Sequence, residues 1–113
     1  MDEVNAALER LVSAVRNSEE YIRYQRAREE LHKEPELEQK VHEFRRKNFQ
    51  IQNSGNVNLF DEVDRLEKEN TELRRMPVVE EYLSAELAFC RAIQHINWVL
   101  IDRLDFDLGL QNE

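Results

Sequence analysis

The stretch PELEQKVHEFRRKNFQIQN, residues 35–53, decides the fold of this chain. Its seam positions recur alternately four and three residues apart, with one polar interruption, in the series Leu37, Val41, Phe44, Asn48 and Ile51. This spacing places a single apolar seam along a helix, and such a seam needs a partner to cover it. Flanking residues such as Phe49 widen the seam, so we expect this helix to touch neighbours on more than one side.

The composition favours an all-α protein. The 113 residues include only 2 Gly and 2 Pro, while 41% of residues are apolar and 35% are charged. Few turn residues and many helix formers are typical of a helical domain, whereas a sandwich or barrel needs frequent turns. The length is that of one domain, residues 1–113. We therefore expect a single all-helical domain.

Helix breakers and caps divide the chain into about five helices, which we predict over residues 2–15, 19–33, 35–53, 60–75 and 77–104. Asn17 and Glu20 fit a capping box that begins the second helix. Pro35 and Pro77 fit the first turns of two others, because proline disfavours helical geometry in the residue before it. Residues 53–58 are predicted to reverse the chain, and residues 105–113 to form a frayed tail.

The first and last predicted helices carry apolar residues beyond the central stretch. The first has one stripe that we expect to be buried on a single side: Val4, Leu8, Leu11, Val12 and Val15. The last would be about 42 Å long, whereas a compact chain of this length has a radius of gyration of about 13 Å. We expect an elongated bundle in which the long helix overhangs the core, and a homodimer is predicted to cover Trp98, Ile101 and Phe106.

The candidate protein-interface residues combine the central seam with the long last helix. They are Val41, Phe44, Asn48, Phe49, Phe89, Trp98 and Ile101. We interpret them as apolar or seam positions in excess of what one small core should bury.

Charge argues against a chain whose main task is coating nucleic acid. The net charge is -8, and the basic residues between 23 and 47 alternate with acidic ones. Glutamates four residues before a base, such as Glu19 before Arg23 and Glu43 before Lys47, favour solvated ion pairs along each helix. The alternative is an RNA-binding module whose contacts would be Arg23, Arg26, Arg28, Arg45, Arg46 and Lys47, with Tyr21 and Tyr24 stacking on bases. Half-buried packing of both tyrosines is the better interpretation.

No catalytic or metal-binding constellation is evident. Cys90 is the single cysteine, so one chain forms no internal disulfide, and we expect it to be a small core residue. Glu29 and His32 have the Glu-x-x-His spacing of di-iron bundles, but the required second copy is missing. We predict no enzymatic activity, metal or cofactor. The absence of an apolar run of about 18 residues and of a signal sequence predicts a cytoplasmic protein.

Three segments together resemble a known family: EYIRYQRAREEL at 20–31, PELEQKVHEFRRKNFQIQ at 35–52, and MPVVEEYLSAELAF at 76–89. Over about residues 4–104 the chain resembles the YlbF/YmcA/YheA family of small, all-helical bacterial cytoplasmic proteins. The resemblance implies a regulator of bacterial development that acts as a non-enzymatic adaptor.

For YlbF-like and YmcA-like members, the resemblance implies partners among family paralogues and a complex that affects messenger-RNA processing by RNase Y. Competence, biofilm formation and sporulation depend on that complex. YlbF-type members carry extra cysteines associated with an iron–sulfur cluster. This chain has only Cys90, so the resemblance favours the YheA-like branch, which lacks an established role.

Overall fold

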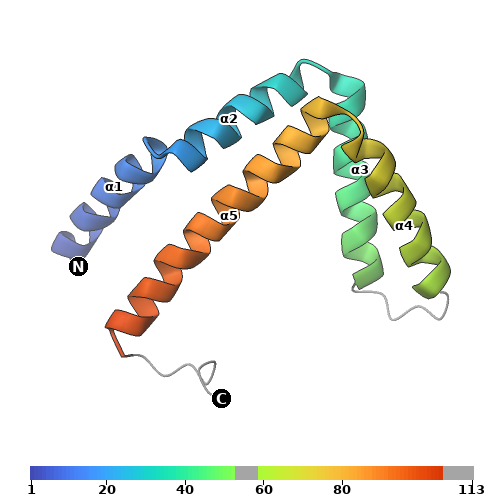
Figure 1. Cartoon of the computed structure of the whole chain (residues 1–113). Coiled ribbons are helices and arrows are strands. Elements are labelled where there is room, and N and C mark those ends of the chain that lie inside the picture. Colours follow the sequence, from blue (N-terminus) through green and yellow to red (C-terminus); the bar gives the residue numbers. More distant parts are fainter. Residues whose placement is uncertain (53–58, 106–113) are drawn as a thin grey trace.

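The computed structural model describes residues 1–52 and 59–105, and its helices are drawn in Figure 1. Five helices follow one another: α1 (Asp2–Arg16), α2 (Glu19–His32), α3 (Pro35–Gln52), α4 (Leu59–Arg74) and α5 (Pro77–Arg103). The described ranges contain no strand. The predicted all-α class and five-helix order are confirmed. The turn predicted at 53–58, the tail at 106–113 and Phe106 lie outside the described residues.

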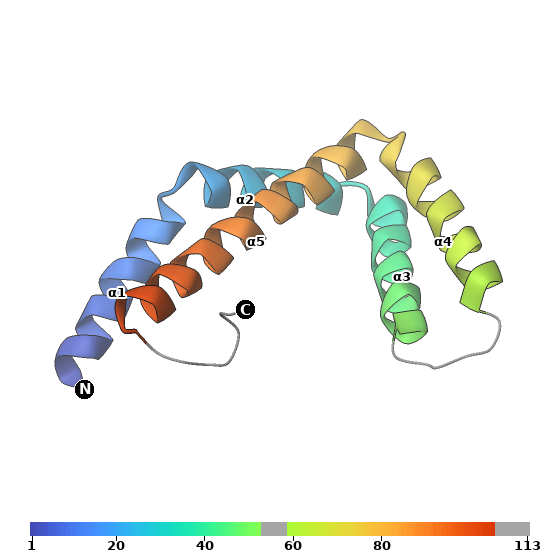
Figure 2. The same cartoon turned by 60° about the horizontal axis from the view of Figure 1, so that its bottom comes forward.

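The helices form two arms that meet where α2 is followed by α3 and where α4 is followed by α5 (Figures 1 and 2). In one arm, α1 and α2 follow each other and α5 packs antiparallel along α2; in the other, α3 and α4 form a helical hairpin. The molecule measures 48 × 38 × 21 Å, and its radius of gyration is 18.2 Å. A compact chain of this length would have a radius of gyration of about 13 Å. The predicted elongated shape is confirmed.

The two prolines begin helices as predicted. α3 begins at Pro35 and α5 at Pro77. Met76, the residue before the second proline, has the extended backbone angles φ -84° and ψ 118°. Steric conflict with the proline ring explains this conformation, because it excludes helical geometry at the preceding residue.

The break between α1 and α2 differs from the prediction. Ser18, and not Asn17, is the N-cap of α2, and its hydroxyl accepts a hydrogen bond from the Tyr21 N–H at 3.3 Å. Asn17 instead ends α1, where its side-chain amide donates to the Ser13 carbonyl at 2.9 Å. The cap position requires extended backbone, which Ser18 adopts at ψ 153°, whereas Asn17 has ψ 3°.

A small core lies where α2, α3 and α5 meet. Its buried residues are Ala27, Leu31, Val41, Val79, Tyr82 and Ala85. The seam of α3 supplies Val41, while Leu37, Phe44 and Asn48 are partly buried. In α5 the buried residues all lie at or before Ala85. Most of this helix therefore extends beyond the core, as predicted for the long last helix.

Candidate functional site

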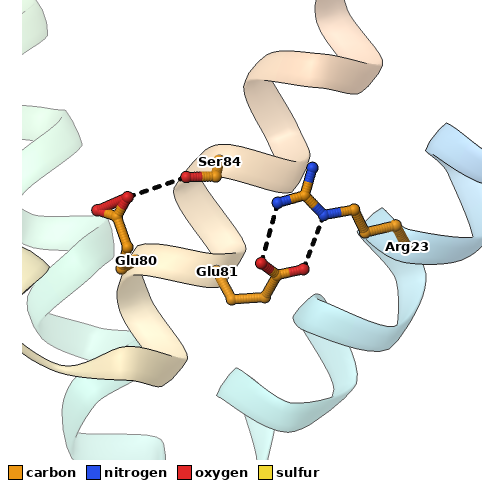
Figure 3. Close-up of polar contacts among 4 residues, drawn as sticks. All are labelled: Arg23, Glu80, Glu81 and Ser84. Carbon is orange, nitrogen blue, oxygen red and sulfur yellow. Dashed lines mark hydrogen bonds and ion pairs between the residues drawn. The ribbon is translucent and has the colours of Figure 1, made fainter.

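A bidentate ion pair joins α2 to the beginning of α5 (Figure 3). Arg23 donates from Nε to Glu81 Oε2 at 2.8 Å and from Nη2 to Glu81 Oε1 at 2.9 Å. The hydrogen bond from Arg23 lowers the pKa of the Glu81 carboxyl, and the same bond raises the pKa of Arg23. Both side chains are about half exposed. The pair therefore fixes the register of two helices at the molecular surface.

The neighbouring glutamate connects a different pair of helices. Glu80 accepts hydrogen bonds from Arg74 Nη1 at 2.6 Å and from the Ser84 hydroxyl at 3.0 Å; Figure 3 shows the second of these. The bond from Arg74 is the main cause that lowers the pKa of Glu80. Arg74 ends α4, so this contact holds the α4 end against the first turn of α5.

Aromatic rings fill the contact between α2 and α5. The Phe89 ring stacks on Tyr24, with centroids 5.5 Å apart, and meets the Tyr21 ring edge-on at 5.3 Å. Both tyrosines are partly buried. The predicted half-buried packing of Tyr21 and Tyr24 is confirmed, and these rings are engaged with protein side chains.

Arg45 reaches from α3 to α5. Its guanidinium donates to a carboxylate oxygen of Glu86 and lies 5.2 Å from the centroid of the Tyr82 ring. Burial alone would lower the pKa of Arg45, but the hydrogen bond with Glu86 contributes to a net increase. Burial also raises the pKa of the Tyr82 phenol to about 12.

Four of the six basic residues of the RNA-binding alternative contact other side chains of the chain. Arg23 pairs with Glu81 and Arg45 with Glu86, while Lys47 Nζ lies 3.3 Å from Glu69 Oε1. Arg28 lies 5.8 Å from the centroid of the Tyr24 ring. Arg26 and Arg46 are exposed on different helices.

These pairings correct the ion pairs expected within single helices. Arg23 and Lys47 bond to carboxylates of neighbouring helices, because α5 and α4 bring Glu81 and Glu69 within reach. The carboxylates also reduce the positive charge that phosphate contacts would require.

The seven candidate interface residues occupy different environments. Val41 is buried inside the chain, and Phe89 belongs to the aromatic contact just described. Phe44, Asn48 and Ile101 are partly buried. The other two are aromatic side chains with large exposed fractions, 67% for Phe49 and 53% for Trp98. The structure does not gather the seven into one surface, and their role in binding stays a prediction.

The prediction for α1 is wrong. Its stripe was expected to be buried on one side, yet α1 contains no buried residue. Val4, Leu8, Leu11 and Val12 are 37–49% exposed. The physical reason is that α5 packs mainly along α2, so that only the end of the stripe, at Val15, is partly buried.

Two open grooves flank the contact between α2 and α5. The first has a volume of about 520 Å³ and lies between α2 and the beginning of α5, lined by Ile22, Arg26, Pro77 and Val78 among others. The second, of about 510 Å³, lies where α1 meets α2 and the middle of α5. The sequence analysis did not predict the second groove, although the apolar stripe on α1, which supplies Val15 to it, indicated an uncovered apolar face.

The residues considered for metal chemistry are not assembled into a site. His32 Nδ1 lies 3.1 Å from Glu38 Oε1, across the junction of α2 and α3. Within the described ranges, no group of three or more His, Cys, Asp or Glu residues is placed to hold a metal ion. Cys90 is exposed, so its expected core position is wrong. The preceding residue, Phe89, packs against α2, whereas Cys90 lies about 100° further around α5 and faces away from that contact.

Among the helices of residues 1–52 and 59–105, none is long and apolar enough to cross a membrane.

Comparison with known proteins identifies relatives along nearly the whole chain. UPF0342 proteins of Caldicellulosiruptor bescii and Caldicellulosiruptor saccharolyticus are 28% and 26% identical over 99 and 98 residues. These alignments cover 85% and 84% of this chain, and 83% and 82% of the relatives. No solved structure matches the chain significantly. The family model described as control of competence regulator ComK, YlbF/YmcA, matches residues 4–105. This chain therefore belongs to the YlbF/YmcA family.

Proposed function

We propose that this protein is a non-enzymatic regulatory adaptor that acts by binding other proteins. The family match to control of a competence regulator supports a regulatory role. The observation that carries the binding role is the exposure of two large aromatic side chains, Phe49 and Trp98. Exposed aromatic residues are enriched at protein interfaces, where they supply most of the binding energy.

The proposed partners are other regulatory proteins, including paralogues of this family and an RNA-processing complex. The family resemblance implies that RNase Y-dependent processing of messenger RNA is the affected step, and that competence, biofilm formation and sporulation are its consequences. The chain would contribute binding surfaces and would catalyse no reaction. The proposed site of action is the bacterial cytoplasm.

RNA binding is the less favoured function. Arg23, Arg45 and Lys47 are paired with carboxylates, and the net charge is -8. A protein that held RNA through these cations would first have to break ion pairs, and its affinity would fall steeply with salt.

A tagged purification from the native host tests the proposal. The full chain is recovered with and without nuclease, and the retained proteins are quantified by mass spectrometry. We expect regulatory or RNA-processing proteins to remain bound after nuclease. Loss of all partners on nuclease treatment would contradict the adaptor role, because RNA would then be the tether.

Two variants identify the binding surface. Phe49→Ala and Trp98→Ala are each expected to reduce the recovery of at least one partner while leaving the helical circular dichroism unchanged. Gln94→Ala is the control, since Gln94 is an exposed polar residue one turn before Trp98. Equal recovery with all three variants would remove these aromatic side chains from the proposed interface.

A further inference from the structure

The first of the two grooves lies between α2 and the beginning of α5, and we name it the α2–α5 groove. Pro77, Val78 and Glu81 form its α5 side. Its α2 side is a single helical face, because the lining residues there lie three or four positions apart. They are Glu19, Ile22, Arg23, Arg26, Ala27 and Glu30. The groove therefore follows α2 for about 16 Å, which is three helical turns.

The floor of the α2–α5 groove is the open edge of the core. Ala27 belongs to the buried cluster, and Val78 packs against that cluster. Ile22, the large apolar side chain of the α2 side, is 39% exposed. Two packed helices leave a furrow between them into which a third helix can insert its side chains. An occupant with apolar side chains against Ile22 and Val78 would therefore extend the core.

The walls of the groove favour a helix over an extended segment as the occupant. Every lining residue belongs to α2 or α5, so the groove offers no sheet edge with which an extended chain could pair. A helix satisfies its own backbone hydrogen bonds, whereas an extended segment in this groove would leave its amides and carbonyls without partners.

Three of the five ionisable side chains that line the groove already have partners within the chain. Arg23 and Glu81 form the fork shown in Figure 3. Glu30 accepts a hydrogen bond from the ammonium group of Lys33 at 2.8 Å. Because an opposite charge lies beside each of them, these three side chains add little net charge to the groove.

The other two, Glu19 and Arg26, present unpaired charges of opposite sign. Both are exposed, and within residues 1–52 and 59–105 neither makes an ion pair or a side-chain hydrogen bond. They are seven positions apart on one face of α2, about 10 Å along the helix, with Ile22 between them. An occupant of complementary charge would place a cation near Glu19 and a carboxylate near Arg26, on either side of an apolar anchor.

We infer that the α2–α5 groove binds an amphipathic helix of another protein, in which one acidic and one basic residue lie two turns apart and flank an apolar stripe. Helical residues seven positions apart face the same way, so these two side chains meet Arg26 and Glu19 together. Apolar residues of the stripe, three or four positions apart, pack against Ile22 and Val78. The inference rests on the proposed function, because it gives the adaptor a binding surface and a partner of stated chemistry.

The test uses three synthetic helical peptides that share one leucine stripe. The first carries glutamate and lysine seven positions apart, the second glutamate at both positions, and the third lysine at both. Fluorescence anisotropy measures the binding of each labelled peptide to the full chain. The mixed peptide is expected to bind most tightly, by about two- to fivefold, which is the range of exposed ion pairs. Equal affinities, or binding of none of the peptides, would overturn the inference.

Charge reversal in the groove is expected to change this preference. Arg26→Glu leaves two unpaired carboxylates, so the peptide with two lysines should bind most tightly. Glu19→Lys leaves two unpaired cations, so the peptide with two glutamates should bind most tightly. Arg46→Glu is the control, since Arg46 is exposed on α3. A shift as large with Arg46→Glu as with Arg26→Glu would mean that net charge attracts the peptides, and it would overturn the assignment to the groove.

Ile22→Asp tests the apolar floor and is expected to abolish the binding of all three peptides. Val63→Asp on α4 is the matched control, because Val63 is 37% exposed and Ile22 39%. Circular dichroism checks that both variants are folded. Unchanged peptide binding by folded Ile22→Asp would contradict the inference. So would a mass in sedimentation equilibrium that falls in Ile22→Asp and not in Val63→Asp, because a second copy of the chain would then occupy the groove.

The inference and the proposed function fail separately. A chain that retains regulatory proteins after nuclease but binds none of the peptides keeps the adaptor role and loses the groove assignment. A chain that binds the peptides with the expected preferences but retains no other protein keeps the groove assignment and loses the adaptor role.

Discussion

The guanidinium of Arg23 and the carboxylate of Glu81 form two parallel hydrogen bonds, of 2.8 and 2.9 Å, between residues 58 positions apart in the sequence. Such a fork fits arginine geometrically, because its planar guanidinium matches the two carboxylate oxygens. The pair connects α2 to α5 next to the groove lined by Ile22 and Val78. Its role is to set the relative position of two helices whose apolar packing supplies most of the stability.

Glu81→Gln is expected to lower the stability of the fold slightly at neutral pH. It should also weaken the loss of stability that occurs as the pH falls into the acid range. The hydrogen bond from Arg23 lowers the pKa of Glu81 below 4.5 in the folded state. This contribution to stability is therefore present above pH 4.5 and is lost as pH falls through the folded pKa. Urea unfolding followed by circular dichroism between neutral and acidic pH measures the effect.

The size of that effect is limited because both partners are about half exposed. Glu3→Gln is a suitable control, since Glu3 is an exposed carboxylate on α1. An acid profile of Glu81→Gln that matches both the wild type and this control would contradict a stabilising role for the pair. Arg23→Lys retains the charge but loses the fork, so we expect it to fall between wild type and Glu81→Gln.

Leu31→Ala is expected to destabilise the chain by about 2–5 kcal/mol, the usual cost of removing a buried leucine side chain. Leu31 is 1% exposed and lies in the core shared by α2, α3 and α5. Leu87→Ala makes the same substitution at a site that is 50% exposed, so its cost should be much smaller. Chemical denaturation of both variants gives the comparison, and equal losses would show that the described core does not hold the fold.

Ser18→Ala is expected to cost about 1 kcal/mol, because the Tyr21 N–H loses its hydrogen-bond acceptor. Ser18→Gly should cost only a few tenths of a kcal/mol, since glycine leaves the amide open to water. Thermal unfolding of the two variants measures the difference. If Asn17→Ala proved more damaging than Ser18→Ala, the assignment of Ser18 as the cap would be wrong.

Local chemistry explains what could be predicted from the sequence. Pro35 and Pro77 begin helices because their rings restrict the residue before them, an effect that needs no tertiary contact. The seam of α3 was predictable for the same reason, since spacing alone places Leu37 and Val41 on one face. The sequence could not predict that Ser18, and not Asn17, caps α2. Both residue types suit the cap position, and the backbone angles decide between them.

Long-range relationships were beyond sequence reasoning. Glutamates near Arg23 in sequence were plausible partners, but α5 brings Glu81 closer. The exposed stripe of α1 shows a related limit. Periodicity identifies an apolar face, and it does not say whether the same chain or another one covers it.

Tyr82→Phe is expected to remove the tyrosine ionisation near pH 12. Tyr82 is 4% exposed, and burial raises the pKa of its phenol from 10.0 to about 12. In the unfolded chain the phenol ionises near its ordinary pKa, so this group stabilises the fold below pH 10 and loses that contribution as pH rises toward 12. Ultraviolet titration of tyrosinate should show a late step in the wild type that is absent in Tyr82→Phe.

Arg45→Gln tests the cause of the raised Tyr82 pKa. Removing the neighbouring cation, whose charge favours the phenolate, should leave the pKa of Tyr82 at least as high. A marked fall of the pKa in Arg45→Gln would mean that Arg45 acts by keeping Tyr82 buried, and the α3–α5 contact would then depend on this arginine for its packing as well as its charge.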